Sequence, residues 1–158
     1  MRPFHVQCHL KPAIRIVPFR RRHLDRILRI ERASFGLEAW PRALFLEFYR
    51  DCRDLFFVAK LSGRIAGYIV TCLEGRTAEI ASLAVHPDCR RRGVAAALIR
   101  RTLRRLPAAG VHRAELMVRT GNAAGAGLYR SLGFRRVRTV RRYYEDGGDA
   151  LLMTRAIQ

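Results

Sequence analysis

The chain has 158 residues, 49% of them hydrophobic, and a formal net charge of +18 at pH 7. This length fits one compact domain and is too short for two ordinary ones, and the apolar content excludes a disordered chain. No apolar run approaches the roughly 20 residues of a membrane-spanning helix, and residues 1–13 lack the apolar core of a secretory signal. We therefore expect one cytoplasmic domain over residues 14–158, a leader at residues 1–13 and no membrane contact.

The first half of the chain predicts one strand, then two helices and then three strands. The predicted elements are strands at 14–19, 55–61, 64–73 and 76–85 and helices at 22–35 and about 44–49. A break at Ala39-Trp40-Pro41 separates the two helices. Ser62-Gly63 joins two β-rich runs and predicts an antiparallel hairpin.

The second half predicts two helices and three strands. The helices run from Arg92-Gly93 to about Leu106 and over 122–132, and the strands cover 111–119, 134–140 and 150–157. Asn122 and Gly133 are expected to cap the second of these helices. Together the elements predict an α/β fold, a mixed and mostly antiparallel sheet of about seven strands with about four helices. The strands at 76–85 and 111–119, joined through a helix, should be parallel neighbours with a ligand crevice at their carboxyl ends.

The cysteines predict no metal site and no disulfide. None forms a Cys-x-x-Cys pair, and they stand at Cys8, Cys52, Cys72 and Cys89. We expect reduced structural thiols. Cys8 lies between His5 and His9, an arrangement that we interpret as coincidence because three possible ligands on a leader are weak evidence for a metal.

The positive charge is concentrated in the second half of the chain. Between His86 and Arg142 there are 15 arginines against only Asp88 and Glu115. Of the 31 basic residues, 29 are arginine, a bias that a GC-rich genome could produce without selection on function. The other interpretation is an anionic partner, such as nucleic acid or a small anion.

Residues 83–95 predict a phosphate-binding loop. Here a strand turns into a helix through consecutive arginines and a glycine. Free N–H groups at a helix start, with the positive end of its dipole, bind pyrophosphate, and bulky side chains at Gly93 or Ala95 would hold the phosphates away. The alternative is a solvated helix start, although arginines beside a positive helix end favour a compensating anion. The Lys-Ser/Thr ending of a P-loop is missing, which argues against ATP or GTP hydrolysis.

Two motifs resemble those of the GNAT superfamily of acetyltransferases. Arg90-x-x-Gly93-x-Ala95 is similar to its pyrophosphate signature, and Asn122-x-x-Gly125-x-x-Leu128-Tyr129-x-x-x-Gly133-Phe134 is similar to its second acetyl-CoA motif. The resemblance covers residues 14–157. It implies a GNAT fold with a splayed parallel strand pair, acetyl-CoA as donor and no metal. The implied cofactor contacts are Leu83, Ala84, Val85, Arg90, Arg91, Arg92, Gly93, Val94, Ala95, Ala96, Asn122 and Tyr129.

Within that superfamily the chain looks most like the RimI-like ribosomal-protein N-terminal alanine acetyltransferases. The likeness rests on Ala39-Trp40-Pro41, on Leu83-Ala84-Val85-His86-Pro87 and on the Arg-Arg-Tyr-Tyr-Glu-Asp-Gly-Gly-Asp-Ala run at 141–150. It implies an acceptor that is the α-amino group of a protein, with Tyr143 and Tyr144 holding the substrate backbone. Packing in the core is the alternative role for these tyrosines.

The resemblance implies direct acetyl transfer, in which Tyr129 is the general acid; a purely structural aromatic is the alternative. RimI-like enzymes carry the basic glutamate where this chain has Met117. Glu79, at the position of the base in the histone-acetyltransferase branch, is our preferred substitute. Glu115 and a water chain are the other possibilities.

Two other functions compete with protein N-terminal acetylation. A small-molecule amine acetyltransferase would need acidic residues around its acceptor pocket, and the chain has 13 in all. A basic nucleic-acid-binding module without catalysis would suit the charge, but no helix-turn-helix, RNA-recognition or zinc-finger pattern is present. The arginines at 100–105 and 135–142 could also dock an enzyme on ribosomal RNA.

Overall fold

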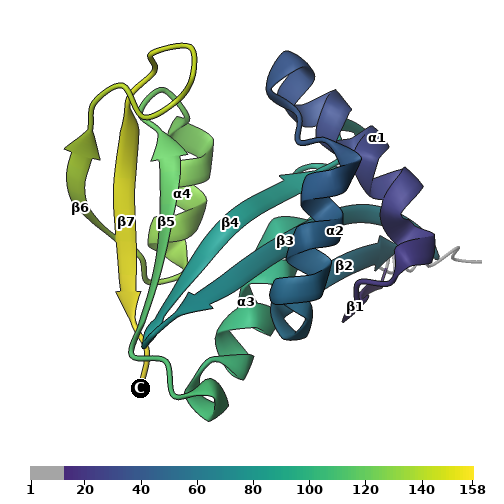
Figure 1. The fold of residues 1–158 in the computed structure, drawn as a ribbon, viewed down its shortest axis with the longest axis horizontal. Coiled ribbons are helices and arrows are strands. Elements are labelled where there is room, and N and C mark those ends of the chain that lie inside the picture. Colours follow the sequence, from purple (N-terminus) through teal and green to yellow (C-terminus); the bar gives the residue numbers. More distant parts are fainter. Residues whose placement is uncertain (1–12) are drawn as a thin grey trace, which may run out of the picture.

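The computed structural model describes residues 13–158, which form a mixed sheet covered by helices (Figure 1). The seven strands lie in the order β1-β2-β3-β4-β5-β7-β6. Their bounds are Ile14–Pro18 (β1), Phe56–Leu61 (β2), Arg64–Glu74 (β3), Thr77–Val85 (β4), Arg113–Arg119 (β5), Arg135–Val140 (β6) and Ala150–Ala156 (β7). The helices are Leu24–Phe35 (α1), Arg42–Asp51 (α2), Val94–Arg105 (α3) and Ala123–Ser131 (α4). The predicted α/β class and element order are confirmed.

The hairpin between β2 and β3 forms where the sequence predicts it. Ser62 and Gly63 have φ angles of 52° and 78°, and Leu61 pairs with Arg64 across the turn. Two central residues with positive φ give the turn whose twist matches that of antiparallel strands.

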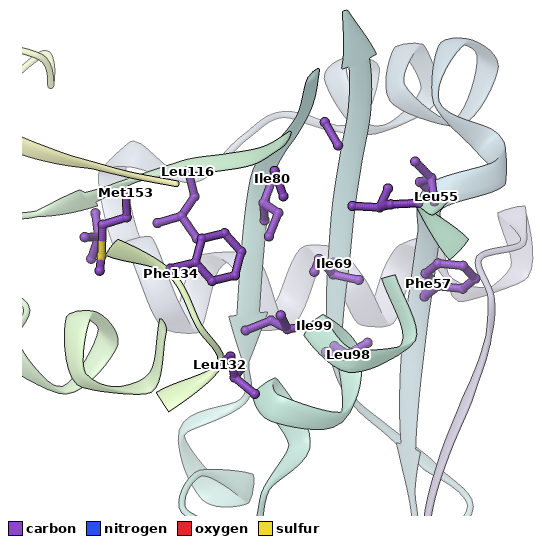
Figure 2. Close-up of a cluster of buried hydrophobic side chains, with 14 of the residues drawn as sticks. Leu55, Phe57, Ile69, Ile80, Leu98, Ile99, Leu116, Leu132, Phe134 and Met153 are labelled. Carbon is purple, nitrogen blue, oxygen red and sulfur yellow. The ribbon is translucent and has the colours of Figure 1, made fainter. Parts of the chain in front are cut away.

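Two hydrophobic clusters pack on opposite faces of the sheet. Leu98 and Ile99 of α3 pack with Ile69, Ile80 and other sheet residues on one face, as Figure 2 shows. The other face packs against α1 and α2. Leu98 and Ile99 form the buried stripe of α3, but the arginine face of the helix is not wholly exposed. Arg101 is partly buried, with its guanidinium 5.5 Å from the centre of the Phe57 ring, because a long aliphatic stem can cover apolar surface.

The strands β4 and β5 are parallel neighbours that pair only over their first halves. Thr77–Ile80 pair with residues 113–116, and beyond this point the two strands diverge, as Figure 1 shows. The register between β3 and β4 also shifts beside Ala81, since Val70 pairs with Ser82 and Thr71 pairs with Ile80. Such a bulge bends a strand and changes which face its side chains take. The prediction of a parallel pair is confirmed, and its carboxyl ends are separated.

The expectation of four reduced thiols is wrong for two of them. Cys52, directly after α2, forms a disulfide with Cys72 on β3, with their Cα atoms 5.1 Å apart. The two are 20 residues apart in sequence, so no short motif indicates the pair; only the packing of α2 beside β3 brings them together. Cys89 is free and partly buried, whereas Cys8 and its neighbouring histidines lie outside the described residues.

Within residues 13–158, no helix has the length and apolar content needed to cross a membrane. The same residues contain no group of three or more histidine, cysteine or acidic side chains placed to hold a metal ion.

Candidate functional site

The gap between β4 and β5 leaves backbone groups free of sheet partners. Ala84 and Val85 pair with β3 on one side, but neither pairs with β5 on the other. Leu83 is also beyond the last β4–β5 pair. The predicted cofactor segment 83–85 therefore faces an open strand edge inside the sheet, where an extended ligand can use the free hydrogen-bonding groups.

The helix α3 begins at the carboxyl end of β4, as the phosphate-loop prediction requires. Its N-cap, Gly93, has φ 81°, and Arg91 before it has φ 61°. The first turn, Val94 to Ala96, has N–H groups without acceptors inside the helix. These donors and the positive end of the helix dipole suit an anion.

The three arginines before Gly93 differ in their surroundings. Arg90 donates from Nε to the Val85 carbonyl oxygen at 3.2 Å, and its Nη2 is 3.5 Å from the Ser34 hydroxyl. Its side chain thus fastens the loop to β4 and α1. Arg91 and Arg92 are exposed at the helix start, where their guanidinium groups can reach a bound anion.

The second predicted motif forms the start and body of α4. The Asn122 Oδ1 accepts a hydrogen bond from the Gly125 N–H at 2.9 Å, which confirms the predicted cap. A Cβ at Gly125 would lie 2.7 Å from the Asn122 side chain, so this cap favours glycine. Tyr129 follows on the same helix, with its ring centre 6.0 Å from that of Phe134.

Tyr129 keeps its proton over the physiological pH range. Burial raises the pKa of Tyr129 to about 12, and the neighbouring Tyr144 contributes a smaller part of the rise. A protonated hydroxyl can donate a proton to a leaving group. The packing against Phe134 also fits a structural role, and a single residue can serve both.

The paired tyrosines lie in the segment between β6 and β7. The rings of Tyr143 and Tyr144 are perpendicular, with centres 5.0 Å apart. Tyr143 is 45% exposed, so packing in the core does not explain it. Burial raises the pKa of Tyr143 and the nearby Glu79 carboxylate raises it further. Tyr144 similarly raises the pKa of Tyr129, so the structure brings these three tyrosines and Glu79 into one neighbourhood.

The two candidate basic carboxylates are neighbours across the parallel strands. Glu79 pairs in register with Glu115, and alternation along β5 puts Met117 on the same face as Glu115. Glu115 lies 3.4 Å from the Arg113 Nε, whereas Glu79 has no ion-pair partner among residues 13–158. Glu79 is exposed, so the apolar surroundings expected for it are absent; its strand neighbours Ala78 and Ile80 pack on the opposite face.

A clasp of four side chains, not predicted from the sequence, joins three segments beside these tyrosines. The Arg119 Nη2 lies 2.6 and 2.7 Å from the two carboxylate oxygens of Glu38, and its Nη1 lies 3.1 Å from Asp146. The same guanidinium lies 4.0 Å from the centre of the Tyr144 ring. Glu38 lies between α1 and α2, and Asp146 lies between β6 and β7. The sequence gives no local signal for contacts between such distant positions.

A buried hydrogen-bond network on the α1 face of the sheet was likewise not predicted from the sequence. Glu31 of α1 is 1% exposed, and one of its carboxylate oxygens accepts from the Trp40 N–H at 2.9 Å. Its other oxygen accepts from the Tyr68 hydroxyl. Tyr68 in turn lies 2.9 Å from the Ser82 hydroxyl on β4. Burial raises the pKa of Glu31, against smaller opposing effects of these hydrogen bonds.

Stability should depend on pH through Glu31. Because the folded pKa is raised, the favourable contribution of this carboxyl is fully present below its unfolded pKa and is lost as pH rises through its folded pKa. Urea unfolding of the wild type and Glu31→Gln, measured from pH 4 to pH 8, should show the wild type losing stability relative to the variant as pH rises. A difference that is constant with pH would contradict this assignment.

The chain is similar in sequence to known acetyltransferases. The model of the Acetyltransferase (GNAT) family matches residues 24–134. An N-alpha-acetyltransferase of Sulfurisphaera tokodaii is 32% identical over 145 residues, covering 82% of this chain and 85% of that protein.

Two solved structures are similar over most of their length. Ard1 from Thermoplasma volcanium has a TM-score of 0.87 and 29% identity, covering 92% of this chain and 99% of that one. The ribosomal-protein-S18-alanine N-acetyltransferase from Escherichia coli has a TM-score of 0.82 and 28% identity, covering 92% and 95%. The resemblance found in the two sequence motifs is thereby confirmed. The chain belongs to the acetyltransferase (GNAT) family and is an acyltransferase enzyme.

Proposed function

We propose that this protein transfers acetyl from acetyl-CoA to the N-terminal α-amino group of a protein, as a single cytoplasmic domain over residues 14–158. The observation that carries the proposal is the perpendicular pair of rings of Tyr143 and Tyr144, whose centres are 5.0 Å apart, with Tyr143 45% exposed. Aromatic rings at the edge of the β4–β5 gap offer a surface for a peptide backbone. The similarity to two protein N-acetyltransferases supports this acceptor class.

The residues around the gap fit acetyl-CoA as donor. The free N–H groups of the first turn of α3, with Arg91 and Arg92 beside them, suit the pyrophosphate. The open edge of β4 at residues 83–85 suits the amide groups of the pantetheine arm. Arg90 would act indirectly, by holding the loop against β4. Asn122 would support this site from the start of α4.

The reaction that we propose needs three proton transfers in the site. The acceptor ammonium gives a proton to the Glu79 carboxylate, and its nitrogen then attacks the carbonyl carbon of the thioester. As the new C–N bond forms, the C–S bond breaks and Tyr129 gives its proton to the leaving sulfur. The new amide nitrogen then gives its surplus proton to the Tyr129 oxygen, which restores the phenol, and Glu79 releases its proton to solvent. Glu79 is preferred over Glu115 because Glu115 is paired with Arg113.

The Arg119 clasp should set the geometry of the acceptor side. Arg119→Met would leave Glu38 and Asp146 without this cation and would remove the stacking on Tyr144. We expect the KM for a peptide acceptor to rise by about tenfold, because the three hydrogen bonds that hold the segments of Glu38 and Asp146 together are lost, while the affinity for acetyl-CoA stays the same. Steady-state kinetics and calorimetry measure the two effects.

Arg113→Met is the matched control for Arg119→Met. Arg113 lies on the same strand and also pairs with a carboxylate, that of Glu115. It is the first residue of β5, whereas Arg119, which contacts the Tyr144 ring, is the last. We expect its peptide KM to match that of the wild type. Equal effects of the two substitutions would show that the clasp has no special role.

We further propose that the arginine-rich surface docks the enzyme on ribosomal RNA. Arg135, Arg136 and Arg138 are exposed on β6, an edge strand with no acidic residue. Binding through phosphate contacts weakens steeply with salt. Sedimentation with ribosomes should show association at low salt that is lost at high salt, and no association at low salt would overturn this docking.

Calorimetry followed by an assay of CoA release tests the proposed function. We expect acetyl-CoA to bind and peptides that begin with alanine to release CoA faster than peptides with other first residues. Release with small amines only would support the small-molecule alternative. Absence of acetyl-CoA binding, together with binding of RNA, would favour a non-catalytic basic module.

A further inference from the structure

The hydrogen-bond network of Glu31, Tyr68 and Ser82 has a consequence for acceptor binding. We propose that Ser82 is a contact for the acceptor amine, and that ionised Glu31, acting through Tyr68, holds the Ser82 hydroxyl with its lone pairs toward that amine. The inference rests on the proposed function, since it requires an amine on this face of β4. Ser82 is then a binding residue, while Glu31 and Tyr68 are positioning residues.

Ser82 lies where β4 leaves β5. The last residue of β4 paired with β5 is Ile80, and the bulge beside Ala81 falls between it and Ser82. Leu83, the next residue, begins the segment whose backbone edge is open. Ser82 is only partly buried, in contrast to Tyr68 behind it. Its hydroxyl can therefore be reached from the gap while it stays bonded to the network.

The direction of each hydrogen bond follows from the number of protons available. An ionised carboxylate only accepts, so both Trp40 N–H and the Tyr68 hydroxyl donate to Glu31. The single Tyr68 proton is thereby used, and its oxygen can only accept from Ser82 at 2.9 Å. The Ser82 proton is used in turn, which leaves its oxygen as a pure acceptor for an amine N–H.

The burial of Glu31 gives independent support for such an orienting role. A carboxylate that is 1% exposed is costly to ionise, and an apolar side chain would fill the same space at lower cost. Among the described residues, Glu31 is the most buried acidic side chain, and both of its oxygens have partners. Its contact with Trp40 also positions the segment before α2, so an experiment must separate the two roles.

A double-mutant cycle of Ser82→Ala and Glu31→Gln separates them. Ser82→Ala removes the contact itself. Glu31→Gln offers one acceptor oxygen to two donors, so the direction of the Tyr68–Ser82 hydrogen bond is no longer enforced. We expect each variant to lower kcat/KM for the peptide by about tenfold without changing acetyl-CoA affinity, as expected for one hydrogen bond to a charged group. The double variant should lose little more than either single variant.

Thr71→Val is the matched control for this cycle. Thr71 is a hydroxyl residue on the neighbouring strand β3; it is fully buried, and its hydroxyl has no hydrogen-bond partner among residues 13–158. We expect its kcat/KM to stay near that of the wild type, which would show that loss of a buried hydroxyl alone is not sufficient. Thermal unfolding of all four variants checks that each one folds.

The outcomes distinguish this inference from the proposed function. Multiplicative losses in the double variant would overturn the inference, because Glu31 would then act through Trp40 alone. Wild-type kcat/KM in Ser82→Ala would overturn it as well. If none of the peptides tested supports release of CoA by the wild-type enzyme, the proposed function fails and the inference fails with it.

Discussion

Tyr129→Phe should lower kcat by roughly 10²–10⁴-fold, the usual contribution of a positioned general acid. The burial that raises the pKa of Tyr129 to about 12 keeps its hydroxyl protonated, and phenylalanine has no proton to give to the leaving sulfur. The affinity for acetyl-CoA should change little, because the ring and its packing against Phe134 remain. Single-turnover kinetics with a peptide acceptor measure the chemical step directly.

Phe134→Leu provides the control for the structural role of Tyr129. It alters the packing partner of the Tyr129 ring without removing the hydroxyl. We expect a lower unfolding temperature but a kcat within a few-fold of the wild type. If Tyr129→Phe reduces stability and leaves kcat unchanged, the tyrosine is structural and another group protonates the sulfur.

Glu79→Gln should lower kcat/KM for the peptide by about 10²-fold near neutral pH, because the acceptor amine is then largely an ammonium that must lose a proton. The defect should shrink as pH rises past the α-amino pKa of roughly 8, where the amine deprotonates without help. A pH–rate profile from pH 6 to pH 10 measures both effects. If the carboxylate only stabilised the fold, the defect in kcat/KM would not disappear at high pH.

Glu115→Gln is the matched control, since the two glutamates are register partners on the parallel strands. We expect activity close to that of the wild type. Unchanged turnover in both variants would instead indicate a water chain.

Met117→Glu in the Glu79→Gln background adds a test of position, because it puts a carboxylate where RimI-like enzymes carry theirs. Recovery of activity at neutral pH would show that the lost group is a base.

Local patterns in the sequence determined the elements and the loop before α3, where we propose that the cofactor binds. The stripe of Leu98 and Ile99 predicts the buried face of α3, and both side chains are fully buried. The asparagine cap of α4 and the loop before α3 were also predicted, because a cap and a helix start depend on residues within one or two turns. The parallel pairing of β4 and β5 followed from the handedness of a strand–helix–strand unit.

The side of the site that we propose for the acceptor was decided by the tertiary structure. The Arg119–Glu38 pair is separated by 81 residues and the Glu31–Tyr68 contact by 37, so neither has a spacing that a sequence pattern could show. The same applies to the Cys52–Cys72 disulfide. The packing of Arg101 on Phe57 is a further long-range contact, since the sequence shows the charge of this residue but not its neighbour in the fold. Short-range backbone preferences are encoded locally, whereas ion pairs and buried networks depend on which distant segments the packed core brings into contact.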